Sequence, residues 1–338
     1  MVTLKEIAQS VGVSPATVSR VLNFDQTMSV SAAKRQAIIE TAEALNYATP
    51  RARNRASPQG LSKIALVHFL RPDQELIDPY YVALRLGIES RCQELKIETV
   101  KVYHTDFLPE PSLLQSASSV IAIGRHDENE IAWLKRHARM LVFADFSPST
   151  DEFDTIESDL MFATRKLLQA LTQAGYRRIA FAGWEQMYNG VALASHEKRY
   201  RAYVEWMNES GHFDERICLT ERNTEESGYR LARRILSEKH RPDALITAND
   251  NMAVGAYRAI HEMRLRIPDD IAVASFNDIS VAQFLNPPLT TVHLPAEEIG
   301  AGAVDLLLER VTGRELPKRV TLATSIRWRA STRLPDPR

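Results

Sequence analysis

The sequence is poor in cysteine, with only Cys92 and Cys218 among its 338 residues. Two thiols so far apart cannot make a disulfide framework, so we expect both to be reduced and inert. The nine histidines stand apart from these cysteines and lack the spacing of metal ligands. The composition therefore excludes a disulfide-stabilised scaffold, and we expect no metal and no cofactor.

Long apolar runs are missing as well. None reaches the roughly 18 residues that a membrane-spanning helix needs. The first residues, Met-Val-Thr-Leu-Lys-Glu-Ile, lack the basic-then-apolar order of a signal peptide. We therefore expect a cytoplasmic protein without a membrane partner.

Common enzyme signatures are also absent. The sequence contains no G-x-G-x-x-G or G-x-x-x-x-G-K-[ST] loop, no G-x-S-x-G elbow and no H-E-x-x-H helix. This absence favours a binding protein over a catalyst, and we assign no catalytic residues.

Charge of either sign is scarce overall, but it is unevenly distributed. The net charge is −1, yet residues 1–58 hold seven basic and four acidic side chains and so carry +3. A small basic module on a mildly acidic body suits binding to DNA phosphates, although many surface segments carry a similar charge.

Residues 1–47 have the pattern of three short helices. A capping box at 3–6 begins the first helix, and Gly12 ends it. Ser14, followed by a proline, begins the second helix, and the third runs from a cap region at 29–31 to about Leu45. Two short helices joined by a tight turn and backed by a third predict a helix-turn-helix, with a plain three-helix domain as the alternative.

The second predicted helix has an apolar and a polar face. Val18 and Val21 point inward, whereas Thr17 and Arg20 point outward, with Asn23 just beyond the helix. Polar side chains that can reach base edges favour DNA binding over the plain three-helix domain.

Residues 48–60 predict a hinge linker between the head and the body. They contain two prolines and three arginines at alternate positions, without apolar periodicity. A solvated linker and a segment that orders on DNA phosphates or in a minor groove are both compatible with this composition.

Residues 61–338 alternate strands and helices, which predicts an α/β body with parallel sheets covered by helices on both faces. Its length exceeds that of one usual domain, so we expect two lobes. The expected strands are 64–69, 97–103, 119–124, 140–145, 177–183, 243–248 and 270–276, and the expected helices lie near 80–95, 158–174, 199–209, 226–238, 251–263 and 297–310.

Three of these strands end in short polar side chains, namely Asp145, Asn249-Asp250 and Asn277-Asp278. In open α/β sheets ligands bind beyond the carboxyl ends of strands, and such side chains suit a ligand rich in hydroxyls or amides. Helix capping is the competing role for the two later aspartates. We assign ligand contact to Asp145, Asn249 and Asn277, and capping to Asp250.

Motifs along nearly the whole chain resemble the lactose/galactose repressor family of transcription regulators. They are Thr3-Leu4-Lys5-Glu6-Ile7-Ala8, Gly12-Val13-Ser14, the run from Ala16 to Asn23, Val30-Ser31, Leu45-Asn46-Tyr47, the run from Ala248 to Ala256, the run from Ile267 to Val273, and the run from Pro287 to Val292. The resemblance implies a homodimer whose paired heads read a palindromic double-stranded operator. It also implies a body like that of periplasmic sugar-binding proteins, with a small effector held between the lobes.

The resemblance places Thr17 and Arg20 in the major groove, and Ser14 and Tyr47 among the residues near phosphates. We expect Arg20 to contact a guanine edge. The full expected set for DNA is Ser14, Ala16, Thr17, Arg20, Asn23, Ser29, Ser31, Tyr47, Arg51, Arg53 and Arg55.

For the effector, the resemblance returns the residues found at the strand ends and adds others. Core packing is the competing role for the two added tyrosines, and Arg201 or Glu197 competes with Arg199 in the alignment. The full expected set is Tyr80, Tyr81, Leu84, Asp145, Arg199, Asn249 and Asn277. We expect the first lobe to comprise about 61–157 and 290–318, and the second about 158–289 and 319–338.

The chain departs from the family pattern at several places. Ala56 stands where the family hinge carries a leucine, Asn277 where an aspartate is common, and no leucine heptad follows Arg333. A dimer is therefore expected rather than a tetramer. Within the family, the runs from Ile77 to Tyr81 and from Asn277 to Ile279 are most similar to a regulator of β-galactosidase synthesis.

That likeness implies a repressor of a sugar-utilisation operon that a galactoside or galactose releases. A regulator that needs its ligand as a corepressor is the alternative, and a sugar-binding transport protein is a more remote one. A sugar-acting enzyme would need paired carboxylates across the cleft, and Asp145 is the one candidate among the strand-end residues.

Overall fold

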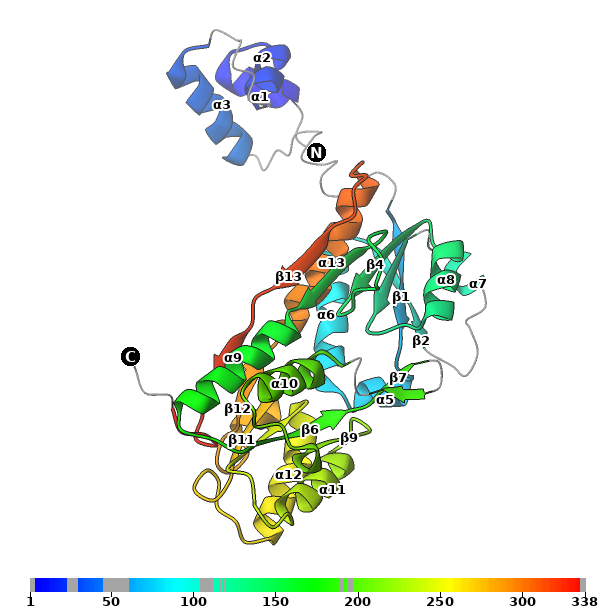
Figure 1. Cartoon of the computed structure of the whole chain (residues 1–338). Helices are drawn as coiled ribbons and strands as arrows, with labels where there is room; N and C mark the ends of the chain where they lie inside the picture. The colour runs from blue at the N-terminus through cyan, green and yellow to red at the C-terminus, as the bar shows by residue number, and fades with distance from the viewer. Residues whose placement is uncertain are drawn as a thin grey trace. The chain divides into compact units, whose positions relative to one another are not determined.

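The computed structural model describes residues 4–22, 30–44, 61–103, 112–115, 117, 119–188, 191–193 and 197–334 (Figure 1). The chain divides into two compact units, one with residues 1–62 and 93–98 and the other with residues 63–92 and 99–338. The first contains three N-terminal helices, which we call the head, and the second contains almost all of the α/β body.

The head is built around a small apolar core. Ile7, Val18 and Ile38, one from each helix, are fully buried. Gly12 joins the first two helices with a φ of +66°, a left-handed backbone that glycine adopts without steric cost. The capping box expected at residues 3–6 begins outside the described residues. The three expected helices are α1 (Leu4–Val11), α2 (Pro15–Leu22) and α3 (Ala32–Ala44).

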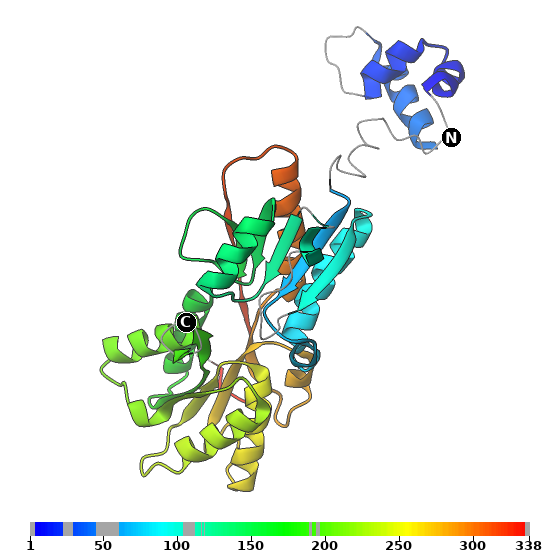
Figure 2. The same ribbon diagram turned by 90° about the vertical axis from the view of Figure 1, so that its right-hand side faces the viewer.

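The body contains two six-stranded sheets, one in each lobe (Figures 1 and 2). In the first sheet the strand order is β13-β5-β4-β3-β1-β2, and every pair from β13 to β1 is parallel. Its strands are β1 (Lys63–His68), β2 (Glu98–Tyr103), β3 (Ser119–Ile123), β4 (Met140–Ala144), β5 (Asp154–Ser158) and β13 (Arg319–Leu322).

In the second sheet the order is β14-β12-β11-β10-β6-β9, and β14 alone of these strands pairs antiparallel. A separate two-stranded antiparallel ribbon joins β7 and β8. The strands are β6 (Ile179–Trp184), β7 (Gln186–Tyr188), β8 (Val191–Leu193), β9 (Cys218–Glu221), β10 (Ala244–Thr247), β11 (Ala272–Asn277), β12 (Thr290–His293) and β14 (Ser325–Arg327).

Helices cover both faces of each sheet, as the parallel strands require (Figure 1). In the first lobe, Leu114 and Trp133 pack with Val120 and Phe143 on one face of the sheet. The helices of this lobe are α5 (Pro72–Leu76), α6 (Pro79–Glu94), α7 (Ser112–Gln115), α8 (Glu128–His137) and α13 (Ala296–Val311). Those of the second are α9 (Leu160–Gln173), α10 (Lys198–Glu209), α11 (Glu225–Leu236) and α12 (Asp250–Glu262), with 3-10 turns η2 (Glu215–Ile217) and η3 (Ser280–Gln283).

Helices α11 and α12 approach each other through glycines. A Cβ at Gly255 would overlap the carbonyl oxygen of Glu225, and one at Gly228 would overlap that of Met252. The close approach therefore depends on the missing side chains, and it fixes the start of α12 beside β10 and β11.

The expected limits of the lobes need two corrections. Strand β12 pairs with β11 and so belongs to the second lobe, although residues 290–293 were expected in the first. Strand β13 pairs with β5 and belongs to the first lobe, although residues 319–322 were expected in the second. Both strands have four residues, and strand pairing between distant segments decides their lobe.

Candidate functional site

Helix α2 presents a polar face to solvent. Ala16 and Arg20 are exposed and Thr17 is half-buried, whereas Val18 and Val21 are buried. The expected division of this helix into inward and outward faces is therefore confirmed. The DNA contacts of its outward residues stay predictions.

Two serines cap the helices of the head. The Ser14 hydroxyl accepts the amide hydrogen of Thr17 at 3.1 Å and shares a hydrogen bond with the Thr17 hydroxyl at 2.9 Å. Ser31 accepts the amide hydrogen of Lys34 at 3.4 Å. The other residues expected on DNA, which are Asn23, Ser29, Tyr47, Arg51, Arg53 and Arg55, lie outside the described residues.

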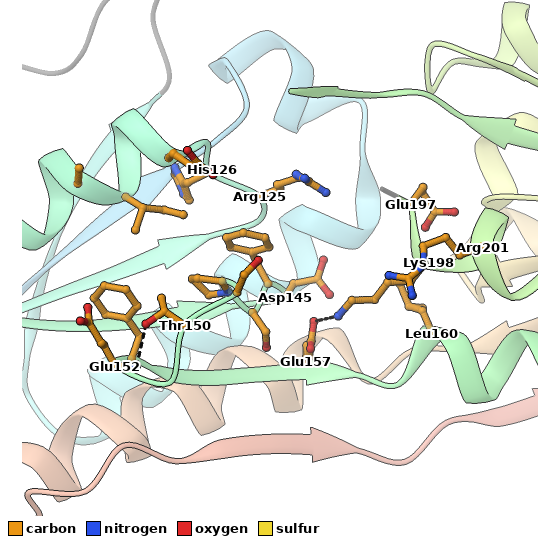
Figure 3. Close-up of a pocket in the computed structure, with 18 of the residues that line it drawn as sticks. Arg125, His126, Asp145, Thr150, Glu152, Glu157, Leu160, Glu197, Lys198 and Arg201 are labelled. Atoms are coloured by element: carbon orange, nitrogen blue, oxygen red, sulfur yellow. Dashed lines mark hydrogen bonds and ion pairs between the residues drawn. The ribbon is translucent and has the colours of Figure 1, made fainter. Parts of the chain in front are cut away.

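The body contains a cavity of about 840 Å³ that is lined by both lobes (Figure 3). Tyr81 and Asp145 line it from the first lobe, and Trp184 and Arg199 line it from the second. The cavity lies beyond the carboxyl ends of β4 and β6, where the topology predicts a ligand site.

Asp145 is the residue that follows β4, and it adopts a left-handed backbone with a φ of +62°. Its Oδ1 accepts the Tyr80 hydroxyl at 2.8 Å, and its Oδ2 accepts the Tyr81 hydroxyl at 3.0 Å. Burial raises the pKa of Asp145 to about 6, although both tyrosine hydrogen bonds act to lower it. At neutral pH the carboxylate is an acceptor with lone pairs left for a ligand hydroxyl.

Tyr80 and Tyr81 lie in the first turn of α6, and both are buried. Asp78 begins this helix by accepting the Tyr80 amide hydrogen at 3.2 Å. The two rings meet edge to face with their centroids 5.1 Å apart. Because both hydroxyls donate to Asp145, the tyrosines orient that carboxylate in addition to their packing role.

Arg199 is held on the opposite wall by three interactions. Its Nε donates to Glu197 Oε1 at 2.8 Å, its Nη1 donates to the Ala248 carbonyl at 2.6 Å, and its guanidinium lies 5.6 Å from the centroid of the Phe276 ring. Arg199 is buried, whereas Arg201 is exposed at the edge of the same cavity. These contacts place the Arg199 side chain more rigidly than that of Arg201.

The other effector residues expected from the sequence do not line this cavity. Leu84 is fully buried. Asn249 accepts the Met252 amide hydrogen at 3.0 Å and donates to Asn223, and Asn277 ends β11 with a φ of +104°. Ligand contact by these three residues stays a prediction.

The capping role that we assigned to Asp250 is wrong. Asn249 caps α12, and Asp250 is the first residue inside the helix. The Asp250 carboxylate instead accepts the Ile279 amide hydrogen at 2.9 Å and the Thr291 hydroxyl at 2.8 Å. It thereby ties α12 to the loop after β11 and to β12.

The structure also brings residues to the cavity that sequence reasoning missed. Arg125 and His126 follow β3, Trp184 ends β6, and Glu157 lies near the end of β5. Lys198 begins α10 and forms an ion pair with Glu157 at 2.5 Å, which joins the two lobes (Figure 3). The strand-end rule would have found Arg125 and His126 if it had been applied to β3 as well.

The cavity has balanced charge, because basic and acidic residues line it in equal number. The Lys135 ammonium lies 2.6 Å from the Glu152 carboxylate, and Arg199 and Lys198 have acidic partners in Glu197 and Glu157. The basic residues are Arg125, Lys135, Lys198, Arg199 and Arg201, and the acidic ones are Glu128, Asp145, Glu152, Glu157 and Glu197. A neutral ligand with many hydroxyls suits such a lining better than an ion does.

Within the described part of the chain, no group of three or more histidine, cysteine or acidic residues is placed to hold a metal ion. In the same residues, no helix combines the length and the apolar character needed to cross a membrane.

The chain is similar to known regulators at both ends. Residues 3–50 match the bacterial regulatory proteins of the lacI family, and residues 168–332 match the periplasmic binding protein-like domain. The HTH-type transcriptional repressor MelR of Bacillus subtilis (strain 168) is 35% identical over 340 residues, which cover 98% of this chain and 97% of MelR. The chain belongs to the lacI family. It is therefore a DNA-binding transcription regulator and not an enzyme, and its first helices form the helix-turn-helix that the sequence predicts.

Two further lacI-family relatives bear on the effector and the operator. The lactose operon repressor of Rhizobium radiobacter is 58% identical over 111 residues, which cover 33% of this chain and 98% of that protein. The solved structure of the lac repressor dimer bound to operator and the anti-inducer ONPF is 25% identical, with a TM-score of 0.67, and covers 98% of this chain and 99% of that chain. The expected fold, a helical head on a two-lobed α/β body, is confirmed by this likeness.

Proposed function

We propose that the chain is a homodimeric repressor of a sugar-utilisation operon and that a galactoside or galactose in the interlobe cavity releases it from DNA. The observation that carries this proposal is the Asp145 carboxylate, oriented by Tyr80 and Tyr81 in a cavity that both lobes line. The name of the Rhizobium radiobacter relative supports a galactoside.

The two walls of the cavity offer complementary hydrogen-bonding groups to a sugar. Asp145 accepts hydrogen bonds from sugar hydroxyls. Arg199 uses two of its five N–H groups on Glu197 and Ala248, so three remain to donate to sugar oxygens. A sugar ring between them replaces its bonds to water with bonds to both lobes.

The head supplies the DNA contacts in this proposal. Arg20 donates to O6 and N7 of a guanine in the major groove, and Thr17 lies beside it. Ser14 and Ser31 lie near phosphates, which position the head without reading sequence. Two heads of a dimer read the two halves of a palindrome, in keeping with the dimeric, operator-bound relative. Such a regulator works in the cytoplasm, where its operator is.

Effector and operator are coupled through the arrangement of the lobes. A ligand that contacts Asp145 and Arg199 together favours the arrangement that brings these residues close. It therefore shifts the population of the body towards that arrangement. If the operator-binding dimer prefers the other arrangement, the ligand lowers operator affinity by the same coupling free energy.

The test uses the full chain and a fluorescent operator duplex selected from random sequence. Lactose or galactose should release the duplex from the unaltered protein. Asp145→Asn should need about tenfold more sugar or higher, because a hydrogen bond to a charged acceptor is lost, while operator affinity without sugar stays the same. Asp159→Asn is the matched control, because Asp159 caps α9 away from the cavity and asparagine caps a helix equally well.

Fluorescence anisotropy separates the outcomes of this titration. Tighter operator binding on addition of sugar would assign the ligand a corepressor role. Failure of every sugar to bind or to change operator affinity would overturn the proposed effector class.

A further inference from the structure

The cavity continues from Asp145 into the first lobe, away from Arg199. Figure 3 shows His126, Thr150 and Glu152 on one side of Asp145, and Glu197, Lys198 and Arg201 on the other. The first-lobe part lies between α8 and the segment 146–153 that follows Asp145. We call it the outer arm, and its lining includes Arg125, His126, Lys135, Phe146, Ser149 and Thr150.

His126 brings an unused hydrogen-bonding atom to the outer arm. The residue is 4% exposed, and its Nε2 has no hydrogen-bond partner among the described residues. Its Nδ1 lies 3.5 Å from the Glu130 carboxylate, and its ring packs 6.2 Å from that of Phe143. Buried polar atoms in folded proteins nearly always have a partner, so the Nε2 atom indicates a group that binds there.

The contacts of the His126 ring also define which group binds. A neutral imidazole carries its proton on the nitrogen that faces an acceptor, here the Glu130 carboxylate. The other nitrogen, Nε2, is then a hydrogen-bond acceptor. The matching ligand group is a donor such as a sugar hydroxyl.

The dimensions of the cavity leave room for such a group. Its 840 Å³ lie in the upper part of the range of about 300–1,000 Å³ that is typical of pockets for drug-sized ligands. Asp145 and Arg199 need one sugar ring between them, so the outer arm remains. Phe146 gives this arm an apolar wall, with the Arg125 guanidinium 5.9 Å from its ring centroid, and Ser149 and Thr150 add hydroxyls.

We propose that the outer arm is a second subsite, which takes the second ring of a disaccharide or larger glycoside. A hydroxyl of that ring donates a hydrogen bond to Nε2 of His126, while the first ring occupies the part of the cavity beside Asp145 and Arg199. This inference rests on the proposed sugar effector, and it makes the effector a two-ring galactoside rather than free galactose.

Calorimetry on the full chain tests the second subsite with galactose, lactose and melibiose as probes. His126→Phe keeps a ring of similar size but removes the acceptor. It should weaken binding of at least one of the two disaccharides by about tenfold, the effect of one hydrogen bond, and leave galactose affinity unchanged. His137→Phe is the matched control, because His137 ends α8, bonds the Trp133 carbonyl at 2.8 Å and does not line the cavity.

A second variant covers the case in which His126→Phe does not fold. Ser149 is exposed, so Ser149→Trp fills the outer arm without disturbing the core. It should abolish the affinity that the disaccharides gain over galactose.

The outcomes distinguish the subsite from the proposed function. Equal losses for galactose and the disaccharides, or no loss in either variant, would overturn the second subsite while galactose binding upheld the sugar effector. If the unaltered protein bound none of the three sugars, both proposals would fail.

Discussion

Asp250 is a fully buried carboxylate that holds the loop after β11 beside the start of α12. Burial raises its pKa to about 7, and the nearby Asp278 charge acts in the same direction, whereas the hydrogen bonds from Thr291 and Ile279 act to lower it. The loop that it holds includes the region just after Asn277, which we expect to contact the effector.

The raised pKa of Asp250 predicts a pH dependence of stability. The carboxyl group binds its proton more tightly in the folded chain than in the unfolded one, so its contribution to stability is complete below about pH 4 and is lost as pH rises through about 7. Asp250→Asn removes this titration. The fall in the free energy of unfolding between pH 4 and pH 7.5 should therefore be smaller in the variant, by up to roughly 4 kcal/mol.

Urea unfolding at several pH values measures the difference. Burial also raises the pKa of Asp78 and Asp145 to about 6, but both are present in each protein, so the difference isolates Asp250. Asp159→Asn should keep the unaltered pH dependence. Parallel pH profiles for the Asp250 variant and the unaltered chain would contradict the prediction.

At the scale of an element, α2 combines two functions on opposite faces. Val18 and Val21 fasten it to α1 and α3, and the exposed face with Ala16 and Arg20 is left for DNA. A change on the exposed face should therefore alter recognition without altering the fold of the head.

Arg20→Ala tests this division of labour. It should weaken operator binding by about 1–3 kcal/mol and bring it close to the affinity for scrambled DNA, because a base contact is lost. The free energy of unfolding should hardly change, because Arg20 is exposed. Lys34→Ala removes the same charge from an exposed position on α3 and should weaken both duplexes alike. Anisotropy with both duplexes decides, and an unchanged preference for the operator would exclude the base contact.

At the scale of the whole molecule, the body and the head perform separable tasks. A fragment of residues 61–338 should bind the galactoside as tightly as the full chain, because Asp145 and Arg199 both lie in the body. It should remain a dimer in sedimentation experiments but lose operator affinity. The full chain should bind operator less tightly as salt rises, because phosphate contacts release counterions. A monomeric fragment, or operator binding that is insensitive to salt, would contradict this account.

Much of the fold could be predicted because its signals are local. Helix α2 follows from Ser14 and from apolar side chains at helical spacing, and β4 follows from an apolar run that ends before Asp145. The short strand β5 (Asp154–Ser158) and the short strand β13 were missed, because polar residues interrupt their apolar patterns. Their place in the sheet depends on pairing with distant strands.

The site was predicted in part for the same reason. Asp145 follows from its place at the end of a strand, and the family resemblance adds Tyr81 and Arg199, all of which line the cavity. His126 was missed, because no local pattern shows that its Nε2 lacks a partner or that α8 faces the segment 146–153.

The sequence by itself determined the three helices of the head, the alternating body and the carboxylate at the end of β4, because spacing, caps and apolar runs act over a few residues. Only the tertiary structure decided that Asn249 rather than Asp250 caps α12 and that Asp250 instead binds Ile279 and Thr291. The physical reason is that a polar side chain takes the partner that folding brings within hydrogen-bond distance, and that partner can be tens of residues away in the chain.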